Sequence, residues 1–577
     1  MQIKVTKSGP RRYIQVVRSV WDAAAGRPRQ EYIATLGRLD QLKDSDIDTL
    51  VNGLLRVGDR PTLKDIEKGI SSETTAFEPA LTLGDVWTVM RIWSQLGLTK
   101  IISQKARRTR HQIPLEQLVR VMVVNRLSDP MSKLGILRWL ETVCLPGIAT
   151  EQVTHQRLLR AMDFLMEHKD AIEEALTRTL LPLFDTEMDV VFYDITTVRV
   201  HGETEFEGDI REYGKSKAHS GTDRQFAVGV VQTADGFPVT HEVFEGAVGE
   251  TTTVKAVVHR LCERFPIRRL IFVADRAMVS AGNLEVLESV ELPDGKRTQY
   301  IIAVPARTFR EMTQDLGELH LELVAESRVT GKESVRESEV DGRRVVMAHC
   351  PEIAARSRRM RARKLVKVLR LARKLANRLN AQEDGNRSPG RPLTDDGAKI
   401  TFHEALAKHR LTRLIEIHLD DEVFSWDWKL DELKRDLMLD GKLVIVSNVP
   451  KSDMSSEELI RRYKDLADIE RGFRVLKSQI EIAPVHHRLP DRIRAHTMIC
   501  FLALVIQRVM RHRLRKHKVE MSPEAALYRL RTIQRHSVKV GTGKQLTGIS
   551  TIALDQRGLF DALEVAPPTR KHIETAK

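Results

Sequence analysis

The sequence has few cysteines, and their spacing forms no metal-binding pattern. Cys144, Cys262, Cys350 and Cys500 lie far apart, with no CxxC pair and no histidine at zinc-ligand spacing. We interpret them as buried or incidental thiols of a protein in a reducing compartment. The first residues, MQIKVTKSGPRRYIQVV, lack the apolar segment of a signal peptide. Together these absences predict a cytoplasmic protein.

Long apolar runs and internal repeats are also lacking. The longest apolar run, MICFLALVI at 498–506, is too short to span a bilayer, so we expect a buried helix and no membrane partner. The 577 residues exceed what one hydrophobic core normally serves. The chain is therefore expected to form several structural units.

Negative charge is under-represented. The chain has 93 Lys and Arg against 79 Asp and Glu, a net charge of +14. An excess spread over a folded protein favours a polyanionic partner, usually nucleic acid and less often a membrane surface.

The first third of the chain predicts a small β module followed by helices. The β-rich segments RYIQVVRSVWD and RQEYIATLG flank the turn-forming stretch AAAGRP, which is typical of a hairpin. From about 80 to 185, apolar residues recur three and four positions apart, and RRTRH at 107–111 is strongly basic. This helical region is either a DNA-binding domain or a packing subdomain.

The period then changes to that of buried strands. The segment at 189–200, DVVFYDITTVRV, is a continuous β-branched and aromatic run, and further strands are expected within 224–246, at 268–278 and at 298–306. We therefore expect an α/β core with a mixed five-stranded sheet and flanking helices. A stretch from about 308 to 440 interrupts it. Within that stretch, 356–379 has eleven Lys or Arg and no acid, which predicts a helix that contacts phosphates or is simply solvated.

Three acidic residues stand where carboxylates are uncommon. Asp194 lies inside the first core strand, Asp275 lies at the end of RLIFVADRAM, and Glu470 shares the apolar stripe of a helix with Leu459 and Phe473. Taken singly, each aspartate is compatible with a hydrogen bond to a loop amide. Glu470 is compatible with an ion pair to a neighbouring cation in its own helix. Together, the three carboxylates are suited to hold two divalent cations for phosphoryl transfer on nucleic acid.

The sequence around these acids resembles the DDE-type insertion-sequence transposases, which have a ribonuclease H-like catalytic core. FYDITTV is similar to the motif of the first aspartate and VADRAM to that of the second. YGKSKAHSGTDRQFAVGVVQTADGFPV is similar to the segment between them, and EIAPVHHRLPDRIRAHTMICFLALVI to the region after the glutamate. The resemblance covers about residues 185–510, and the N-terminal hairpin is also similar.

One branch of that family carries a Tyr, Arg, Glu, Lys signature on its last catalytic helix. Tyr463, Glu470 and Lys477 stand at three of these places, whereas Leu466 takes the place of the arginine. The resemblance implies that Asp194, Asp275 and Glu470 are catalytic and bind two Mg²⁺ ions, for which Mn²⁺ can substitute. Tyr463, Arg474 and Lys477 are then expected to bind DNA.

The resemblance also implies the activity and the partners. It predicts a transposase that binds the ends of its element in double-stranded DNA, cleaves them by metal-dependent phosphoryl transfer and joins the 3′-hydroxyl ends to target DNA. A homodimer or higher oligomer and a bacterial, nucleoid-associated location in the cytoplasm are expected. The alternatives are a related nuclease or resolvase, and a catalytically silent DNA-binding protein derived from a transposase.

The same patterns predict the division of the chain. The 195 residues between Asp275 and Glu470 exceed a bare core and imply an insertion subdomain, β-rich in this branch, that grips transposon-end DNA. The expected units are a β-hairpin module at 1–75, a helical domain at 76–185, the first part of the catalytic core at 186–307, the insertion at 308–439, the second part of the core at 440–535 and a tail at 536–577.

Two further groups of residues have open interpretations. Trp426 and Trp428 either stack on a flipped base or pack a core, and core packing is the commoner role of a Trp pair. His219, His486 and His487 are candidates for phosphate contact, and nothing in the sequence supports a metal role for them.

Overall fold

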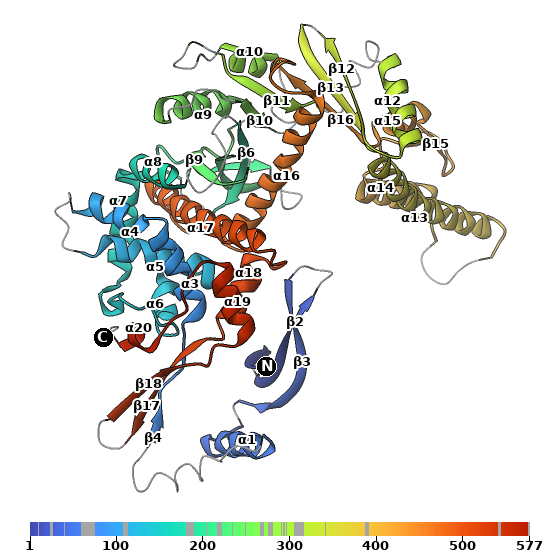
Figure 1. The fold of residues 1–577 in the computed structure, drawn as a ribbon. Helices are drawn as coiled ribbons and strands as arrows, with labels where there is room; N and C mark the ends of the chain where they lie inside the picture. Colours follow the sequence, from blue (N-terminus) through green and yellow to red (C-terminus); the bar gives the residue numbers. More distant parts are fainter. Residues whose placement is uncertain are drawn as a thin grey trace.

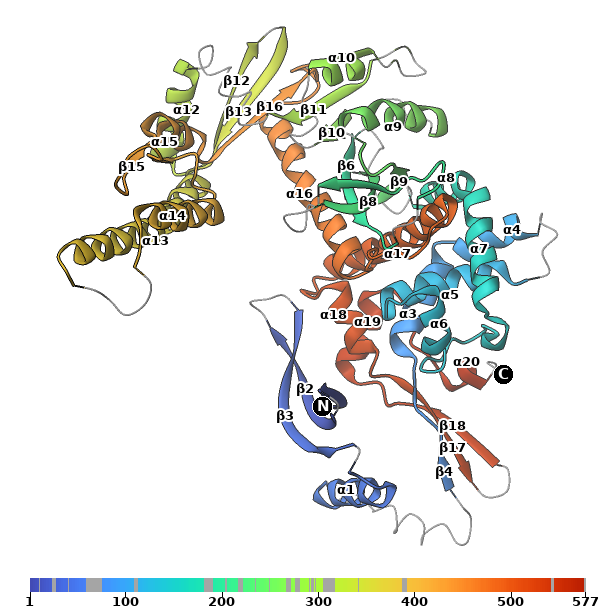
Figure 2. The same ribbon diagram turned by 180° about the vertical axis from the view of Figure 1, so that it is seen from behind.

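The chain folds around one large mixed sheet, with a helical unit on one side and a projecting arm on the other (Figures 1 and 2). The structure is a computed structural model. It describes residues 1–9, 11–22, 27–39, 41–58, 75–107, 113–180, 190–202, 205–215, 222–233, 235–248, 250–265, 271–274, 281–289, 291, 295, 297–304, 317–340, 342–386, 392–540 and 544–574. Within these ranges, the description of Asp194 and of residues 466–471 is limited to the backbone.

The N-terminal module is a three-stranded antiparallel sheet. Its strands β1 (Gln2–Ser8), β2 (Arg11–Asp22) and β3 (Arg27–Arg38) pair in the order β1-β2-β3, and α1 (Asp44–Val57) follows them. The expected hairpin is confirmed as the pair β2 and β3. Strand β1 was not expected.

A helical unit follows, and a helix from far along the chain completes its core. Its helices are α3 (Gly84–Gln95), α4 (Leu98–Ala106), α5 (Leu115–Ser128), α6 (Lys133–Trp139), the 3₁₀ turn η1 (Thr150–Gln152), α7 (His155–Glu167) and α8 (Lys169–Leu180). Helix α17 (Pro490–Lys516) packs against α5 and α7. By length and composition α17 is apolar enough to cross a membrane, but 94% of that window is buried inside the protein. The expected buried helix at 498–506 is thus confirmed.

The central sheet has nine strands among the described residues, four more than expected. The five expected strands are β6 (Val190–Arg199), β8 (Thr222–Thr233), β9 (Pro238–Phe244), β10 (Ile271–Ala274) and β11 (Gln299–Ala303), and the others are β7 (Glu212–Lys215), β12 (Ser334–Val340), β13 (Arg343–His349) and β16 (Lys442–Ser447). The order is β12-β13-β16-β11-β10-β6-β8-β7, with β9 also paired to β8. Only β10 runs parallel to its neighbours β6 and β11, so the sheet is mixed, as predicted.

Each face of the sheet has its own core. Side chains alternate along β6: Phe192 and Val198 join the cluster that contains α16 (Ser456–Ser478) and α17. Tyr193 and Ile195 join the opposite cluster, with α9 (Glu250–Arg264) and α10 (Ala281–Ser289). Strand β6 is therefore buried on both faces, as its continuous apolar run predicts.

The range expected for the insertion contains two different parts. Strands β12 and β13 extend the central sheet, because β13 pairs with β16. The remaining elements are α12 (Gly317–Thr330), α13 (Pro351–Glu383), α14 (Asp395–His409), β14 (Ile415–Ile417), β15 (Trp426–Trp428) and α15 (Leu430–Leu439). Helices α13 and α14 share a small separate core and form the arm in Figure 1. The described arm is mainly helical, contrary to the β-rich insertion that the resemblance implied.

The tryptophan pair belongs to the core of this arm. Trp426 and Trp428 are half-buried, with their ring centroids 5.9 Å apart, and Trp426 lies 5.8 Å from the ring of Phe402 on α14. These contacts correspond to the packing interpretation of the pair.

The C-terminal segment is folded onto the helical unit. Its elements are α18 (Pro523–Leu530), β17 (Gln534–Val540), β18 (Lys544–Ile549), α19 (Leu554–Ala562) and α20 (Arg570–Glu574). Strand β17 pairs with β18 and with β4 (Thr75–Phe77) and β5 (Leu81–Thr82), which precede the helical unit. The range expected as a tail from 536 therefore takes part in a sheet with residues around the expected boundary between the first two units, at 75 and 76.

The junction between α3 and the C-terminal segment depends on a glycine. An added Cβ at Gly84 would lie 2.2 Å from the carbonyl oxygen of Leu530. We expect Gly84→Ala to lower the free energy of unfolding by about 1–3 kcal/mol, because backbone must move to admit the methyl group. Gly558→Ala is the matched control: Gly558 lies within α19 with nothing within 4 Å, so alanine should stabilise by up to about 1 kcal/mol. Denaturant midpoints that shift equally in both variants would contradict this packing.

Candidate active site

The two central parallel strands bring the sequence around the two aspartates side by side. In the register of β10 against β6, Val273 pairs with Phe192. Each of these residues stands two positions before an aspartate in the sequence, Asp275 and Asp194 respectively. Asp194 pairs on its other side with Val230 of β8. Asp275 lies outside the described residues.

Helix α16, which contains Glu470, packs across these strands. Its start is fixed by Ser455, whose hydroxyl accepts a hydrogen bond from the amide of Glu458, and acidic residues occupy its first turn. Leu459, Ile460 and Phe473 are buried in the core on this face of the sheet. The helix contacts β6 and β10 directly, so the backbone of Glu470 belongs to the element that covers the strands of both aspartate motifs.

Buried polar groups lie beside this helix, next to Gly472. An added Cβ at Gly472 would lie 2.6 Å from the Nη2 of Arg508 on α17 and 3.3 Å from the Nε2 of Gln232 on β8. Gln232 is fully buried, pairs across the sheet with Phe192, and its amide has no hydrogen-bond partner in the described part of the chain. A polar amide this deep in an apolar core is costly unless it is hydrogen-bonded, so the unpartnered amide of Gln232 indicates a polar site at this junction.

Sequence reasoning missed Gln232 and Arg508. Each is a polar residue inside an apolar run, QFAVGVVQT in the strand and FLALVIQRVM in the helix. A polar residue that interrupts an apolar run was the signal in the sequence that could have pointed to both residues.

Of the three residues expected to bind DNA, two lie within one turn of α16 and the third lies far from them. Arg474 and Lys477 are exposed and stand about 4.5 Å apart along the axis of α16. Tyr463 is half-buried against the main core, about 21 Å along the axis from Lys477. The description of Leu466, at the arginine place of the signature, is limited to its backbone.

The metal-binding residues proposed from the sequence are not tested by side-chain geometry. Among the residues with described side chains, no group of three or more His, Cys, Asp or Glu is placed to hold a metal ion. Asp194, Asp275 and Glu470 are not among those residues, so the triad stays a prediction. The described cysteines Cys144, Cys350 and Cys500 are free thiols.

Comparison with known proteins establishes the class. Residues 185–506, more than half of the chain, match the family described as "Transposase DDE domain". The chain therefore belongs to the DDE transposases, enzymes that generally use divalent metal ions. Residues 3–66 match the description "IS1634 family transposase, N-terminal domain", which makes the protein a transposase of insertion-sequence type.

Solved structures give weaker similarities. The piggyBac transposase synaptic complex with hairpin DNA is 9% identical with a TM-score of 0.35, and the match covers 85% of this chain and 84% of that chain. The Drosophila P element transposase strand transfer complex is 12% identical with a TM-score of 0.19, and the match covers 73% of this chain and 92% of that chain. No curated protein matches the sequence.

Proposed function

We propose that this transposase binds the ends of its insertion sequence in double-stranded DNA, cleaves them and joins the freed 3′-hydroxyl ends to target DNA. The main support for this proposal is the register of β10 against β6. Val273 lies opposite Phe192, and α16 packs across both strands. Continued by two residues, this register would bring Asp275 beside Asp194. Alternation along β6 would turn Asp194 toward the face that α16 covers.

The carboxylate set suits Mg²⁺. Asp194, Asp275 and Glu470 would together offer only hard oxygen ligands, which Mg²⁺ and Mn²⁺ prefer. Two such ions, when bound, activate the attacking oxygen and stabilise the leaving oxygen of a phosphodiester. The buried, unpartnered amide of Gln232 fits a polar site at this junction.

The chain's own cations would hold the DNA. The exposed Arg474 and Lys477 near the end of α16 would contact backbone phosphates. Tyr463 would contribute through its exposed portion. The basic helix α13 presents further cations, although Arg361 is committed to an ion pair with Asp440 (2.5 Å).

The proposal extends to architecture and assembly. We assign β6, β8, β9, β10, β11 and α16 to a ribonuclease H-like core, with the helical unit and the arm as DNA-gripping parts. Joining two element ends requires at least two active sites, so a homodimer or larger oligomer follows. The enzyme would work in the bacterial cytoplasm on nucleoid DNA.

The activity is tested with a labelled duplex that carries the element end and an unlabelled target plasmid. With Mg²⁺, we expect both nicked ends and covalent end–target products, and chelation by EDTA should remove both. Cleavage without joined products would instead identify a nuclease or resolvase. End binding without metal-dependent cleavage would identify a catalytically silent DNA-binding protein.

A further inference from the structure

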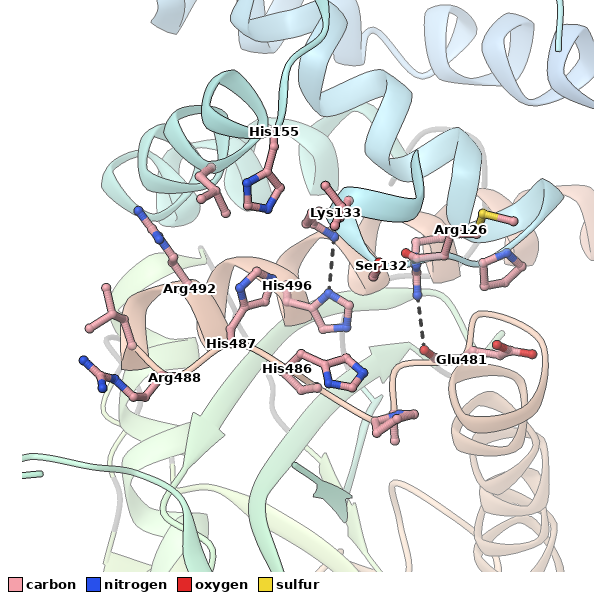
Figure 3. A pocket seen from close by; sticks show the side chains of 18 residues that line it. Arg126, Ser132, Lys133, His155, Glu481, His486, His487, Arg488, Arg492 and His496 are labelled. Atoms are coloured by element: carbon pink, nitrogen blue, oxygen red, sulfur yellow. Dashed lines mark hydrogen bonds between the residues drawn. The ribbon is translucent and has the colours of Figure 1, made fainter. Parts of the chain in front are cut away.

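A cavity of about 760 Å³ lies between the helical unit and the loop that follows α16 (Figure 3). Its walls come from the end of α5, the start of α6, the start of α7, residues 481–489 and the first turns of α17. These segments lie far apart in the sequence. The three acids predicted to bind metal are not among the residues that line this cavity.

The lining of the cavity is strongly basic. Arg126 and Lys133 lie at its floor, and Arg488 and Arg492 lie near its rim. His155, His486, His487 and His496 also line it, and Glu481 is the one acidic side chain among the described residues of the lining. Arg492 is partly neutralised by Asp163 at 3.5 Å.

Lys133 is the central group, because it is buried at 4% exposure and points into the cavity (Figure 3). Its Nζ lies 3.5 Å from Nδ1 of His496, whose Nε2 lies 3.1 Å from the carbonyl oxygen of Ile482. Since a carbonyl only accepts, Nε2 carries the proton and Nδ1 accepts from Lys133. In the described part of the chain, no carboxylate forms an ion pair with Lys133.

The surroundings do not compensate the charge of Lys133. Burial, and then the nearby Arg126, lowers the pKa of Lys133 to about 7. Burial, and then Lys133, lowers the pKa of His487 to about 3, so this histidine is neutral at pH 7. A desolvated ammonium beside neutral histidines and arginines lacks an anion, and a ligand can supply it.

The cavity is linked to the central strand of the candidate active site. The amide of His201, just after β6, donates to the carbonyl of Val485 in the cavity wall, at 2.9 Å. Val200, directly after β6, forms a bridge with Val485 and stands six residues after Asp194, about 20 Å along an extended strand. That distance corresponds to about six base pairs of duplex DNA.

We propose that this cavity is a phosphate-binding site, with Lys133 as its main ligand, which takes a backbone phosphate of the DNA a few base pairs from the cleaved bond. The assignment of the phosphate to DNA rests on the proposed function. Arg488 and Arg492 would contact the neighbouring backbone at the rim. The bound phosphate would give Lys133 its missing counter-ion.

Calorimetry with pyrophosphate tests the site without DNA. We expect Lys133→Met to bind pyrophosphate at least about tenfold more weakly than the wild type, since one charge-assisted hydrogen bond contributes about 1.5–3 kcal/mol. Methionine has a similar length and removes a buried charge, so the fold should be kept. Arg488→Gln should also weaken binding. Arg494→Gln, a nearby α17 variant outside the lining, is the matched control and should bind as the wild type does.

The salt dependence of DNA binding distinguishes the source of the phosphate. If the site takes a DNA phosphate, the slope of log K against log salt should be smaller by about 0.9 in Lys133→Met. Loss of pyrophosphate binding with an unchanged slope would overturn the DNA assignment and indicate a free phosphate compound. Unchanged pyrophosphate affinity in both variants would overturn the site. Because neither measurement involves cleavage, failure of the proposed activity is detected separately.

Discussion

Asp194→Asn and Glu470→Gln are each expected to lower the rate of element-end cleavage by about 10³-fold or more. Metal ions contribute several kcal/mol of transition-state stabilisation, and each 1.4 kcal/mol is tenfold in rate. An amide is nearly isosteric with the carboxylate but is a far weaker ligand for Mg²⁺. The rates are measured on a labelled duplex at saturating Mg²⁺.

The same variants should bind the element end as tightly as the wild type. The matched control is Glu457→Gln, an exposed acid in the first turn of the same helix, which should cleave at the wild-type rate. If an acidic variant retains both end binding and cleavage, its assignment to the metal site is wrong.

A second measurement separates loss of metal from damage to the fold. Neighbouring carboxylates repel one another when no cation is bound. In EDTA, Asp194→Asn should therefore unfold at the same temperature as the wild type or at a higher one. Added Mg²⁺ should raise the unfolding temperature of the wild type and of Glu457→Gln but not that of the acidic variants. A lower midpoint of Asp194→Asn in EDTA would point to a structural role for this aspartate.

Local patterns predicted the elements of the fold better than their partners. The strands β6, β8, β9, β10 and β11 and the buried helix α17 lie in segments rich in apolar residues, and such segments can be recognised from the sequence. The additional strands β12, β13 and β16 join the sheet through pairings that no local pattern encodes. Likewise, β17 pairs with β4 across more than 450 residues of sequence, so the C-terminal segment was mistaken for a tail.

Some residues of the candidate site could likewise be predicted from the sequence, whereas others could be found only from the fold. Motifs led to the three acids, because their residue types stand in a recognisable order. The meeting of Gln232, Gly472 and Arg508 depends on three elements that only the fold brings together. Lys133 and His496 meet across 363 residues, and the stretch DPMSKLG around Lys133 gives no sign of burial.

A buried acid between the helical unit and the central sheet provides the largest expected effect on stability. Glu173 on α8 is fully buried. Its carboxylate lies 2.7 Å from Nδ1 of His241 on β9, 3.0 Å from Arg264 on α9 and 3.3 Å from Lys169. The hydroxyl of Thr240 also donates to it, at 2.8 Å. One carboxylate thus joins elements of both units.

Glu173→Gln should lower the free energy of unfolding by about 3–5 kcal/mol, because it removes the fully buried anion that Lys169 and Arg264 share. Their remaining partners, chiefly Asp170 and Glu242, are more exposed than Glu173.

Glu174→Gln is the matched control: this neighbour also reaches Arg264, at 3.6 Å, and Arg178, at 3.9 Å, but it is more exposed than Glu173 and should cost less than about 1 kcal/mol. Unfolding is followed by urea titration, with proteolysis at the α8 junction as a local probe. Equal midpoints for the two variants would contradict a role of Glu173 in docking the helical unit.

The dependence on pH gives the effect of Glu173 a second signature. Burial alone would raise the pKa of Glu173, but Lys169, His241 and Arg264 together lower it. A lowered pKa in the folded state means that the stabilisation is complete above the unfolded value of about 4.3 and is lost as the pH falls below it. The stability gap between wild type and Glu173→Gln should therefore be constant above about pH 5 and close under more acidic conditions. A gap as large at pH 3 as at pH 7 would show that the amide disturbs packing rather than charge.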